Sequence, residues 1–143
     1  MISVTVVAVG RAKTPGLAPA IEEYENRLRH YVRFESIEVR TPARMLGRVP
    51  EDSRLIALTR EGKRWSTRDL AAQLEDVQTY GGMGLAFVIG GADGLGPDIL
   101  ERAHSRLSLS NMTLPHELAR LVLTEQLYRA GTLLRGEPYH RGP

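Results

Sequence analysis

The stretch FVIGGADGLG, residues 87–96, decides the fold, and LSLSNMTLPHELARLVLTEQLYRA, residues 107–130, follows it after a short spacer. In the first stretch an apolar run ends in glycines and leads to Pro97, a pattern typical of a buried strand, a tight turn and the start of a helix. Outward from it, short apolar runs alternate with longer helical patterns along the chain. This alternation predicts an α/β fold with a mainly parallel central sheet flanked by helices.

The same patterns locate the individual elements. Strands are expected at residues 2–9, 34–39, 55–59, 85–89 and 106–109, each bounded by Gly, Pro or polar residues. Helices are expected at residues 19–31, 67–80, 97–104 and 115–134, the second behind Ser66 or Thr67 as its N-cap. A chain of 143 residues without internal repeats or linkers is expected to form a single domain over residues 1–143.

Composition excludes several classes of protein. The chain has no cysteine, which excludes disulfides and thiolate nucleophiles, and its histidines lack the spacing of metal ligands, so no metal is expected. No apolar segment is long enough to cross a bilayer, and the first residues read as a buried strand rather than a signal peptide, so we expect a cytoplasmic protein without a membrane partner. A net charge of +2 and a pI near 9.2 permit a nucleic-acid partner without requiring one.

The glycine turn has two interpretations of equal weight. It lies between a strand and a helix, where α/β proteins bind ligands, and glycine lets a ligand approach the backbone closely. A tight turn that needs glycine only for its geometry explains the residues as well. The spacing matches neither a dinucleotide-binding fingerprint nor a P-loop, so neither phosphate-binding motif is predicted.

The loop at residues 109–114 also has two interpretations. It is most simply a junction between a strand and a helix, with Thr113 as the helix cap. Alternatively, its backbone groups bind the edge of an adenine while Met112 and the leucines supply apolar walls.

Chemistry-bearing side chains gather near the carboxyl terminus. Glu125 and Arg129 are four residues apart, which is the spacing of a surface ion pair on a helix. The terminal Tyr139, His140 and Arg141 are most simply a frayed end, but Gly136 and Pro138 redirect the chain before them. A phenol, an imidazole and a guanidinium together are suited to holding and deprotonating a flat polar base.

In this order the segments resemble the SPOUT-class methyltransferases, specifically the ribosomal RNA large subunit methyltransferase H family. The resemblance extends from Val7 to Tyr139 and is most specific from Phe87 onward. It implies a trefoil-knotted SPOUT-type α/β fold, which general topology rules would not predict. It also implies S-adenosyl-L-methionine as methyl donor without a metal. The implied substrate is N3 of a pseudouridine in 23S rRNA on the assembled ribosome.

The resemblance further implies roles for particular residues. The donor-binding residues carried over from the family are Leu58, Gly90, Leu109, Ser110, Asn111, Met112, Thr113 and Leu114. The family forms homodimers in which the tail of one protomer completes the site of the other. For a pseudouridine imide we expect His140 to accept the N3 proton, Arg129 and Arg141 to donate hydrogen bonds to the flanking carbonyl oxygens, Tyr139 to contact the base and Glu125 to orient Arg129.

Two features leave the recognition of RNA open. The connection at residues 40–54 is shorter than the lysine-containing helical insertion usual in the family, and REGKR at residues 60–64 fits a solvated turn as well as a phosphate contact. Two other functions remain alternatives: a ribosome-binding protein without catalytic activity, and an enzyme for a small nucleotide-like substrate.

Overall fold

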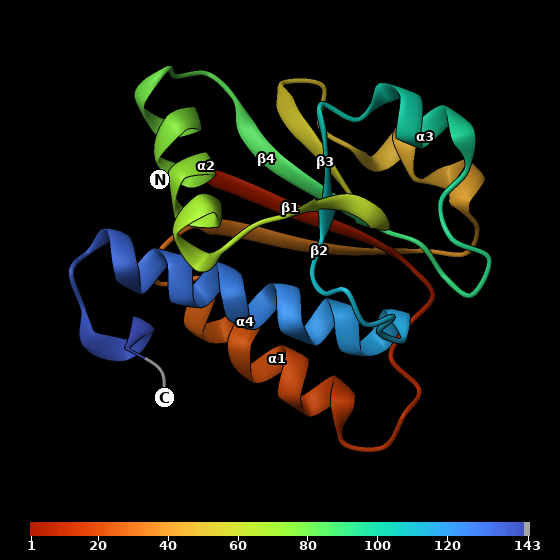
Figure 1. The fold of residues 1–143 in the computed structure, drawn as a ribbon, viewed down its shortest axis with the longest axis horizontal. Helices are drawn as coiled ribbons and strands as arrows, with labels where there is room; N and C mark the ends of the chain where they lie inside the picture. The colour runs from red at the N-terminus through yellow and green to blue at the C-terminus, as the bar shows by residue number, and fades with distance from the viewer. Residues whose placement is uncertain (142–143) are drawn as a thin grey trace.

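The computed structural model describes residues 1–141, apart from the side chain of His140. Within this part the centre is a sheet of five strands in the order β2-β1-β4-β3-β5, with every neighbouring pair parallel (Figure 1). Its strands are β1 (Ser3–Val9), β2 (Arg33–Val39), β3 (Ser53–Arg64), β4 (Gly84–Ile89) and β5 (Ser105–Ser108). The predicted α/β fold with a mainly parallel sheet is confirmed.

Helices cover both faces of the sheet (Figure 1). Three long helices pack on one face: α1 (Leu17–Leu28), α2 (Thr67–Thr79) and α4 (His116–Leu134). The short α3 (Pro97–Arg102) and two 3₁₀ turns, η1 (Pro42–Arg44) and η2 (Leu46–Arg48), lie on the other face. A last 3₁₀ turn, η3 (Pro138–His140), folds back against α4.

The central strands are apolar on both sides because both faces of the sheet are covered. In β4, Phe87 is fully buried toward the three long helices, whereas its neighbour Val88 is fully buried toward α3 and η2. β4 lies between β1 and β3 in the sheet and therefore carries its carboxyl end, and the glycine turn after it, into the middle of one edge of the molecule.

The largest difference from the sequence-based expectation is in β3, while α1 lies at Leu17–Leu28 instead of residues 19–31 and α3 ends two residues earlier than expected. β3 was expected to end at Thr59 but continues to Arg64, with a register shift against β5 between Leu58 and Lys63. The charged residues 60–64 are therefore part of a strand rather than a turn. The short connection before β3 is packed against the sheet, because its Met45 is fully buried in the apolar core on the α3 face.

α2 begins with a complete capping box. The Ser66 hydroxyl accepts a hydrogen bond from the Asp69 N–H at 3.0 Å, and the Asp69 carboxylate accepts one from the Ser66 N–H at 2.7 Å. Ser66, rather than Thr67, is thus the N-cap. These bonds lower the pKa of Asp69, with the backbone bond of Ser66 as the largest cause.

Replacing Ser66 with alanine is expected to lower the free energy of unfolding by about 1 kcal/mol, because an N-terminal N–H of α2 loses its acceptor. Urea unfolding at pH 7 measures this loss, with Thr79→Ala at the exposed far end of the same helix as the control. Because Asp69 has a lowered pKa when folded, the capping contribution is present at neutral pH and disappears as the pH falls below its ordinary value of 3.8. An equal loss at pH 7 in both variants would contradict the prediction.

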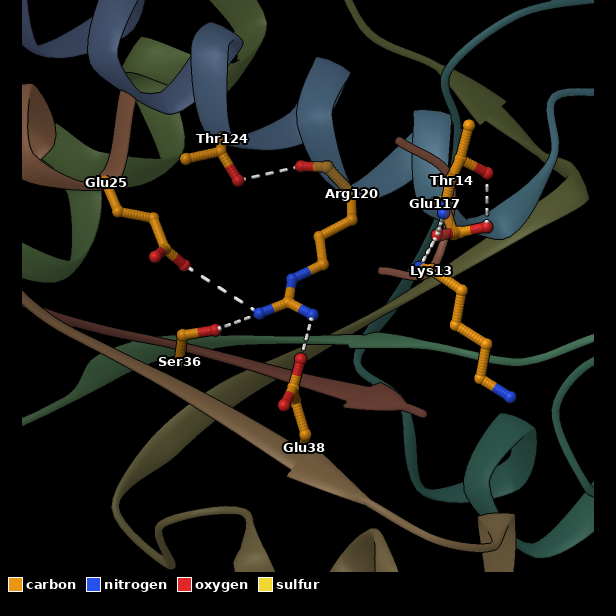
Figure 2. Close-up of polar contacts among 8 residues, drawn as sticks. All are labelled: Lys13, Thr14, Glu25, Ser36, Glu38, Glu117, Arg120 and Thr124. Atoms are coloured by element: carbon orange, nitrogen blue, oxygen red, sulfur yellow. Dashed lines mark hydrogen bonds and ion pairs between the residues drawn. The ribbon is translucent and has the colours of Figure 1, made fainter. Parts of the chain in front are cut away.

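A mostly buried arginine fixes the position of α4 (Figure 2). Arg120 donates to Glu38 at 2.7 Å and to Ser36 at 2.8 Å on β2, and lies 3.9 Å from Glu25 of α1. The guanidinium therefore joins α4 to both α1 and the edge strand β2. This joint holds the amino-terminal turn of α4 beside the carboxyl ends of the strands.

No helix in the described part of the chain is long and apolar enough to span a bilayer.

Candidate functional site

A cavity of about 770 Å³ opens at the carboxyl edge of the sheet, where β3, β4 and β5 end. Its walls are residues 58–61 of β3, the glycine turn after β4, the loop after β5 and the first turn of α4. It is lined by these residues of the predicted donor site: Leu58, Gly90, Leu109, Ser110, Met112, Thr113 and Leu114. Asn111 is exposed and does not line the cavity. Segments separated by about fifty positions in sequence thus meet around one space, as expected for parallel strands.

The glycine turn is closed on itself. A Cβ atom at Gly90 would lie 2.5 Å from the carbonyl carbon of Gly94 and 2.7 Å from its oxygen. Gly94 has φ +74° and donates its N–H to Gly91 at 3.0 Å. A side chain at Gly90 would therefore push two segments of backbone apart, so the geometry of the turn requires glycine here. Gly90 also lines the cavity, and the ligand-binding interpretation therefore concerns the same residue.

The loop after β5 is held by its own side chains. The Ser110 hydroxyl accepts from the N–H of Met112 at 2.9 Å, and the Ser110 carbonyl accepts from the Ser108 hydroxyl at 2.9 Å. Thr113 is not the cap of α4, since that helix begins at His116 behind Pro115 without a capping side chain. Met112 borders the cavity but is 78% exposed, so it contributes less apolar wall than expected.

The extension of β3 adds residues that the sequence analysis did not place in the site. Thr59, Arg60 and Glu61 line the cavity, and Arg60 donates a hydrogen bond to the Thr113 hydroxyl at 3.0 Å. A strand that continues through charged residues has no apolar alternation to mark it. The available signal was Gly62, whose Cβ would lie 2.7 Å from the backbone of Arg106 and which therefore lets β5 approach closely.

The first turn of α4 and the glycine turn supply other wall residues that were not predicted individually. They are Gly91, Ala92, Asp93, Leu95, Pro115, His116 and Ala119. Across the described residues, no three His, Cys, Asp or Glu side chains gather closely enough to hold a metal ion. The lining is instead a mixture of apolar side chains and backbone polar groups, which suits a small organic ligand.

The carboxyl-terminal side chains form a second group, the tail cluster, composed of Glu125, Arg129 and Tyr139. Arg129 contacts the Glu125 carboxylate at 2.8 and 3.0 Å, and the Tyr139 hydroxyl donates to the same carboxylate at 3.0 Å. The Arg129 guanidinium also lies 4.8 Å from the centre of the Tyr139 ring. The predicted Glu125–Arg129 pair is therefore one part of a cluster that holds the tail against α4, rather than a simple surface pair.

The tail cluster sets the charge states of its members. Burial, together with the hydrogen bond to Glu125, raises the pKa of Tyr139, so its phenol stays protonated at neutral pH. The hydrogen bond to Glu125 raises the pKa of Arg129, which stays cationic. Arg141 is exposed, and the side chain of His140 lies outside the described residues.

Within one protomer the tail cluster and the cavity are apart. The cavity contacts α4 at Ala119, whereas Arg129 lies ten residues further along the same helix, a separation of about 15 Å along its axis. The fold brings the glycine turn and the loop after β5 together. It does not bring the tail of the same protomer close to them.

Comparisons with known proteins agree with this architecture. A family model described as "Predicted SPOUT methyltransferase" matches residues 2–140. A ribosomal RNA large subunit methyltransferase H from Anaeromyxobacter sp. (strain Fw109-5) is 47% identical over 150 residues, covering 95% of this chain and 97% of the relative. The protein of the same name from Gemmatimonas aurantiaca is 43% identical over 153 residues, covering 96% and 99%.

A solved structure has a similar fold. The probable methylase family protein from Haemophilus influenzae Rd KW20 superposes with a TM-score of 0.57 at 14% identity, covering 96% of this chain and 69% of that one.

Proposed function

Because this chain belongs to the SPOUT methyltransferases, in the ribosomal RNA large subunit methyltransferase H family, we propose that it methylates N3 of a pseudouridine in 23S rRNA on the assembled ribosome. Membership implies the trefoil-knotted form of the fold and S-adenosylmethionine as methyl donor. We further propose that residues 1–143 act as one methyltransferase domain and that the active enzyme is a cytoplasmic homodimer.

The observation that carries the proposal is the cavity at the carboxyl edge of the sheet. Its volume of about 770 Å³ lies within the usual range for a small-molecule site, and Gly90, which packs directly on the Gly94 backbone, keeps the turn that forms one wall closed. Backbone groups of residues 109–114 are available for the edge of an adenine, and Leu58 and Leu109 offer apolar contact. These residues fit S-adenosylmethionine, which supplies a methyl group already activated by the positive charge of its sulfur.

The acceptor chemistry falls to the tail. N3 of pseudouridine must lose its proton as the nitrogen–carbon bond forms and the carbon–sulfur bond breaks, and negative charge spreads onto the two flanking carbonyl oxygens. Arg129 is a permanent cation with donors suited to such an oxygen. The raised pKa of Tyr139 makes its phenol a donor rather than a base, so the proton acceptor is assigned to His140, whose ordinary pKa is near 6.5. Arg141 is assigned to the second oxygen or to a phosphate.

The separation of cavity and tail supports a dimeric active site. One protomer keeps its tail cluster about 15 Å along α4 from its own cavity, so a second copy packed against α4 would present its tail where the first copy lacks one. The face available for this contact includes Leu118 on α4, which is 38% exposed in the protomer. We therefore propose that the active site is completed by a second copy of the chain.

Methyl-labelled S-adenosylmethionine tests the function directly. The purified protein is incubated with intact ribosomes, stripped 23S rRNA or free nucleosides, and label is followed by nuclease digestion and mass spectrometry. We expect label in ribosomes, on pseudouridine. Label on free nucleosides would favour an enzyme for small substrates, and ribosome binding without label in any sample would favour a non-catalytic binding protein.

A further inference from the structure

The sheet places a second segment at the edge of the donor cavity. β1 is the direct neighbour of β4 on the side away from β3, so the chain that leaves β1 stands beside the glycine turn. This segment, residues 10–16, is the β1–α1 loop, and its Arg11 and Lys13 are both exposed. The donor cavity is thus flanked by cationic residues on two sides, with Arg60 on β3 opposite.

A small hollow links the β1–α1 loop to the donor cavity. Arg11 and Ala12 line it from one side. It shares Ile89, Gly90 and His116 with the larger cavity. Arg11 therefore lies at the border of the proposed donor site, and Lys13 follows two residues further along the same loop.

The loop is clamped by an acidic side chain of α4. One carboxylate oxygen of Glu117 accepts hydrogen bonds from the backbone N–H groups of Lys13 and Thr14, the latter at 3.0 Å. The other oxygen accepts from the Thr14 hydroxyl at 2.9 Å. These bonds lower the pKa of Glu117, with the backbone bond of Thr14 as the largest cause, so the carboxylate is charged at neutral pH. Figure 2 shows the clamp beside Arg120, which fixes the same turn of α4.

The clamp fixes the backbone of the loop and leaves its cations available. The first residue of the loop is held as well, since the Gly10 N–H donates to the Val39 carbonyl at 2.8 Å. In Figure 2 the Lys13 side chain runs away from Glu117 and Arg120, so its ammonium group faces none of the labelled carboxylates. In the described part of the chain, neither Arg11 nor Lys13 forms a salt bridge.

We propose that the β1–α1 loop binds the phosphate backbone of the RNA substrate beside the target nucleotide, and that Glu117 is the positioning residue that holds it there. The inference rests on the proposed function, since a nucleotide that reaches the donor cavity must carry its neighbouring phosphates past the rim. Two cations on a pre-ordered backbone bind such phosphates without first losing the conformational freedom of a loose loop. Recognition is of phosphate charge and position, not of base sequence.

The cations are tested by the salt dependence of RNA binding, which does not depend on methyl transfer. Binding of 23S rRNA is measured at increasing KCl concentrations for the wild type, for Arg11→Gln/Lys13→Gln, and for Arg29→Gln/Arg33→Gln, which removes the same charge at the opposite edge of the sheet. The slope of log K against log salt is expected to fall by about 1 for each phosphate that the first variant no longer neutralises, and to stay unchanged in the second. Equal slopes in the two double variants would overturn the proposal.

The clamp is tested by substitutions of Glu117 under steady-state conditions with ribosomes. Glu117→Ala is expected to raise KM for the ribosome roughly three- to tenfold with kcat and donor affinity unchanged, about the effect of removing a few hydrogen bonds. Glu117→Gln keeps an oxygen that accepts from both backbone N–H groups and is expected to restore most of KM. A fall in kcat at constant KM, or no rescue by glutamine, would show a merely structural role.

Lysine footprinting provides the direct readout. Lys13 and Lys63 are the only lysines of the sequence, so acylation of the protein in the presence of ribosomes reports on two known positions. Lys13 is expected to be protected by RNA in the wild type and in Glu117→Gln. A wild-type protein that methylates ribosomes while Lys13 stays unprotected would overturn this inference alone. Absence of methylation with every RNA would instead overturn the proposed function.

Discussion

Replacing Arg129 with glutamine is expected to lower kcat for methylation of ribosomes about 100- to 1,000-fold, the usual effect of removing one donor to a developing oxyanion. The guanidinium is held by two contacts to Glu125 and stays charged, so it is already oriented before the substrate binds. Glutamine is neutral and too short to keep both contacts. Because Arg129 lies far along α4 from the donor cavity, affinity for S-adenosylmethionine is expected to be unchanged by calorimetry.

Arg135→Gln is the matched control for this experiment. Arg135 lies further along the same chain, stacks on Tyr31 at 4.4 Å and donates to the His30 carbonyl, so the same charge is removed from a contact that does not belong to the tail cluster. Its kcat should remain near that of the wild type. Equal losses in both variants would remove Arg129 from the proposed mechanism.

Replacing Gly90 with alanine is expected to weaken binding of S-adenosylmethionine about 10- to 100-fold. The added Cβ would lie 2.5 Å from the backbone of Gly94, so the turn must open, and a backbone shift of this kind typically costs about 1–3 kcal/mol. Calorimetry with the donor measures the loss directly. We expect donor affinity to change more than the stability of the fold, because the clash lies in the turn at the carboxyl edge of the sheet and not in the buried strands.

Gly47→Ala is the control for Gly90→Ala, because a Cβ at Gly47 meets no atom within 4 Å. It should bind the donor like the wild type. Donor affinity unchanged in Gly90→Ala, with a correctly folded protein, would mean that the cavity is not the donor site.

Mixing the two impaired variants, at a donor concentration too low to saturate Gly90→Ala, tests whether the active site is shared between protomers. Consider a dimer of one Gly90→Ala protomer and one Arg129→Gln protomer. If each site combines the cavity of one chain with the tail of the other, one of the two sites carries both substitutions and the other carries neither. Co-refolded protein is then expected to regain about a quarter of wild-type activity, since about half of the dimers are mixed. No recovery would show that each chain uses its own tail.

Most of the fold could be predicted from the sequence because the sheet is covered on both faces. Its strands appear as short apolar runs, and the helices between them show helical spacing with start signals such as Ser66 and Pro97. β3 was the exception. Its last five residues, REGKR, lie across a register shift after which Lys63 and Arg64 pair with β5, and local hydrophobicity carries no sign of such a shift.

The sequence predicted part of the lining of the cavity, and the donor-binding role of these residues stays a prediction. Gly90 and most of the loop after β5 line one cavity, whereas Arg60, Glu61 and His116 join it only through the path of the chain. The clamp of Glu117 on Thr14 joins residues more than a hundred positions apart, and no local pattern in the sequence indicates it.

The sequence by itself determined where most strands and helices lie, and which residues are candidates for the chemistry, because side-chain periodicity and charge are local properties. Only the tertiary structure decided which of those segments meet. Parallel pairing gathers residues 58–61 of β3 and the carboxyl ends of β4 and β5 around one cavity, and the length of α4 keeps the tail cluster away from it. Contacts between distant residues depend on the order of strands in the sheet, and that order is set by packing of the whole chain rather than by any local stretch.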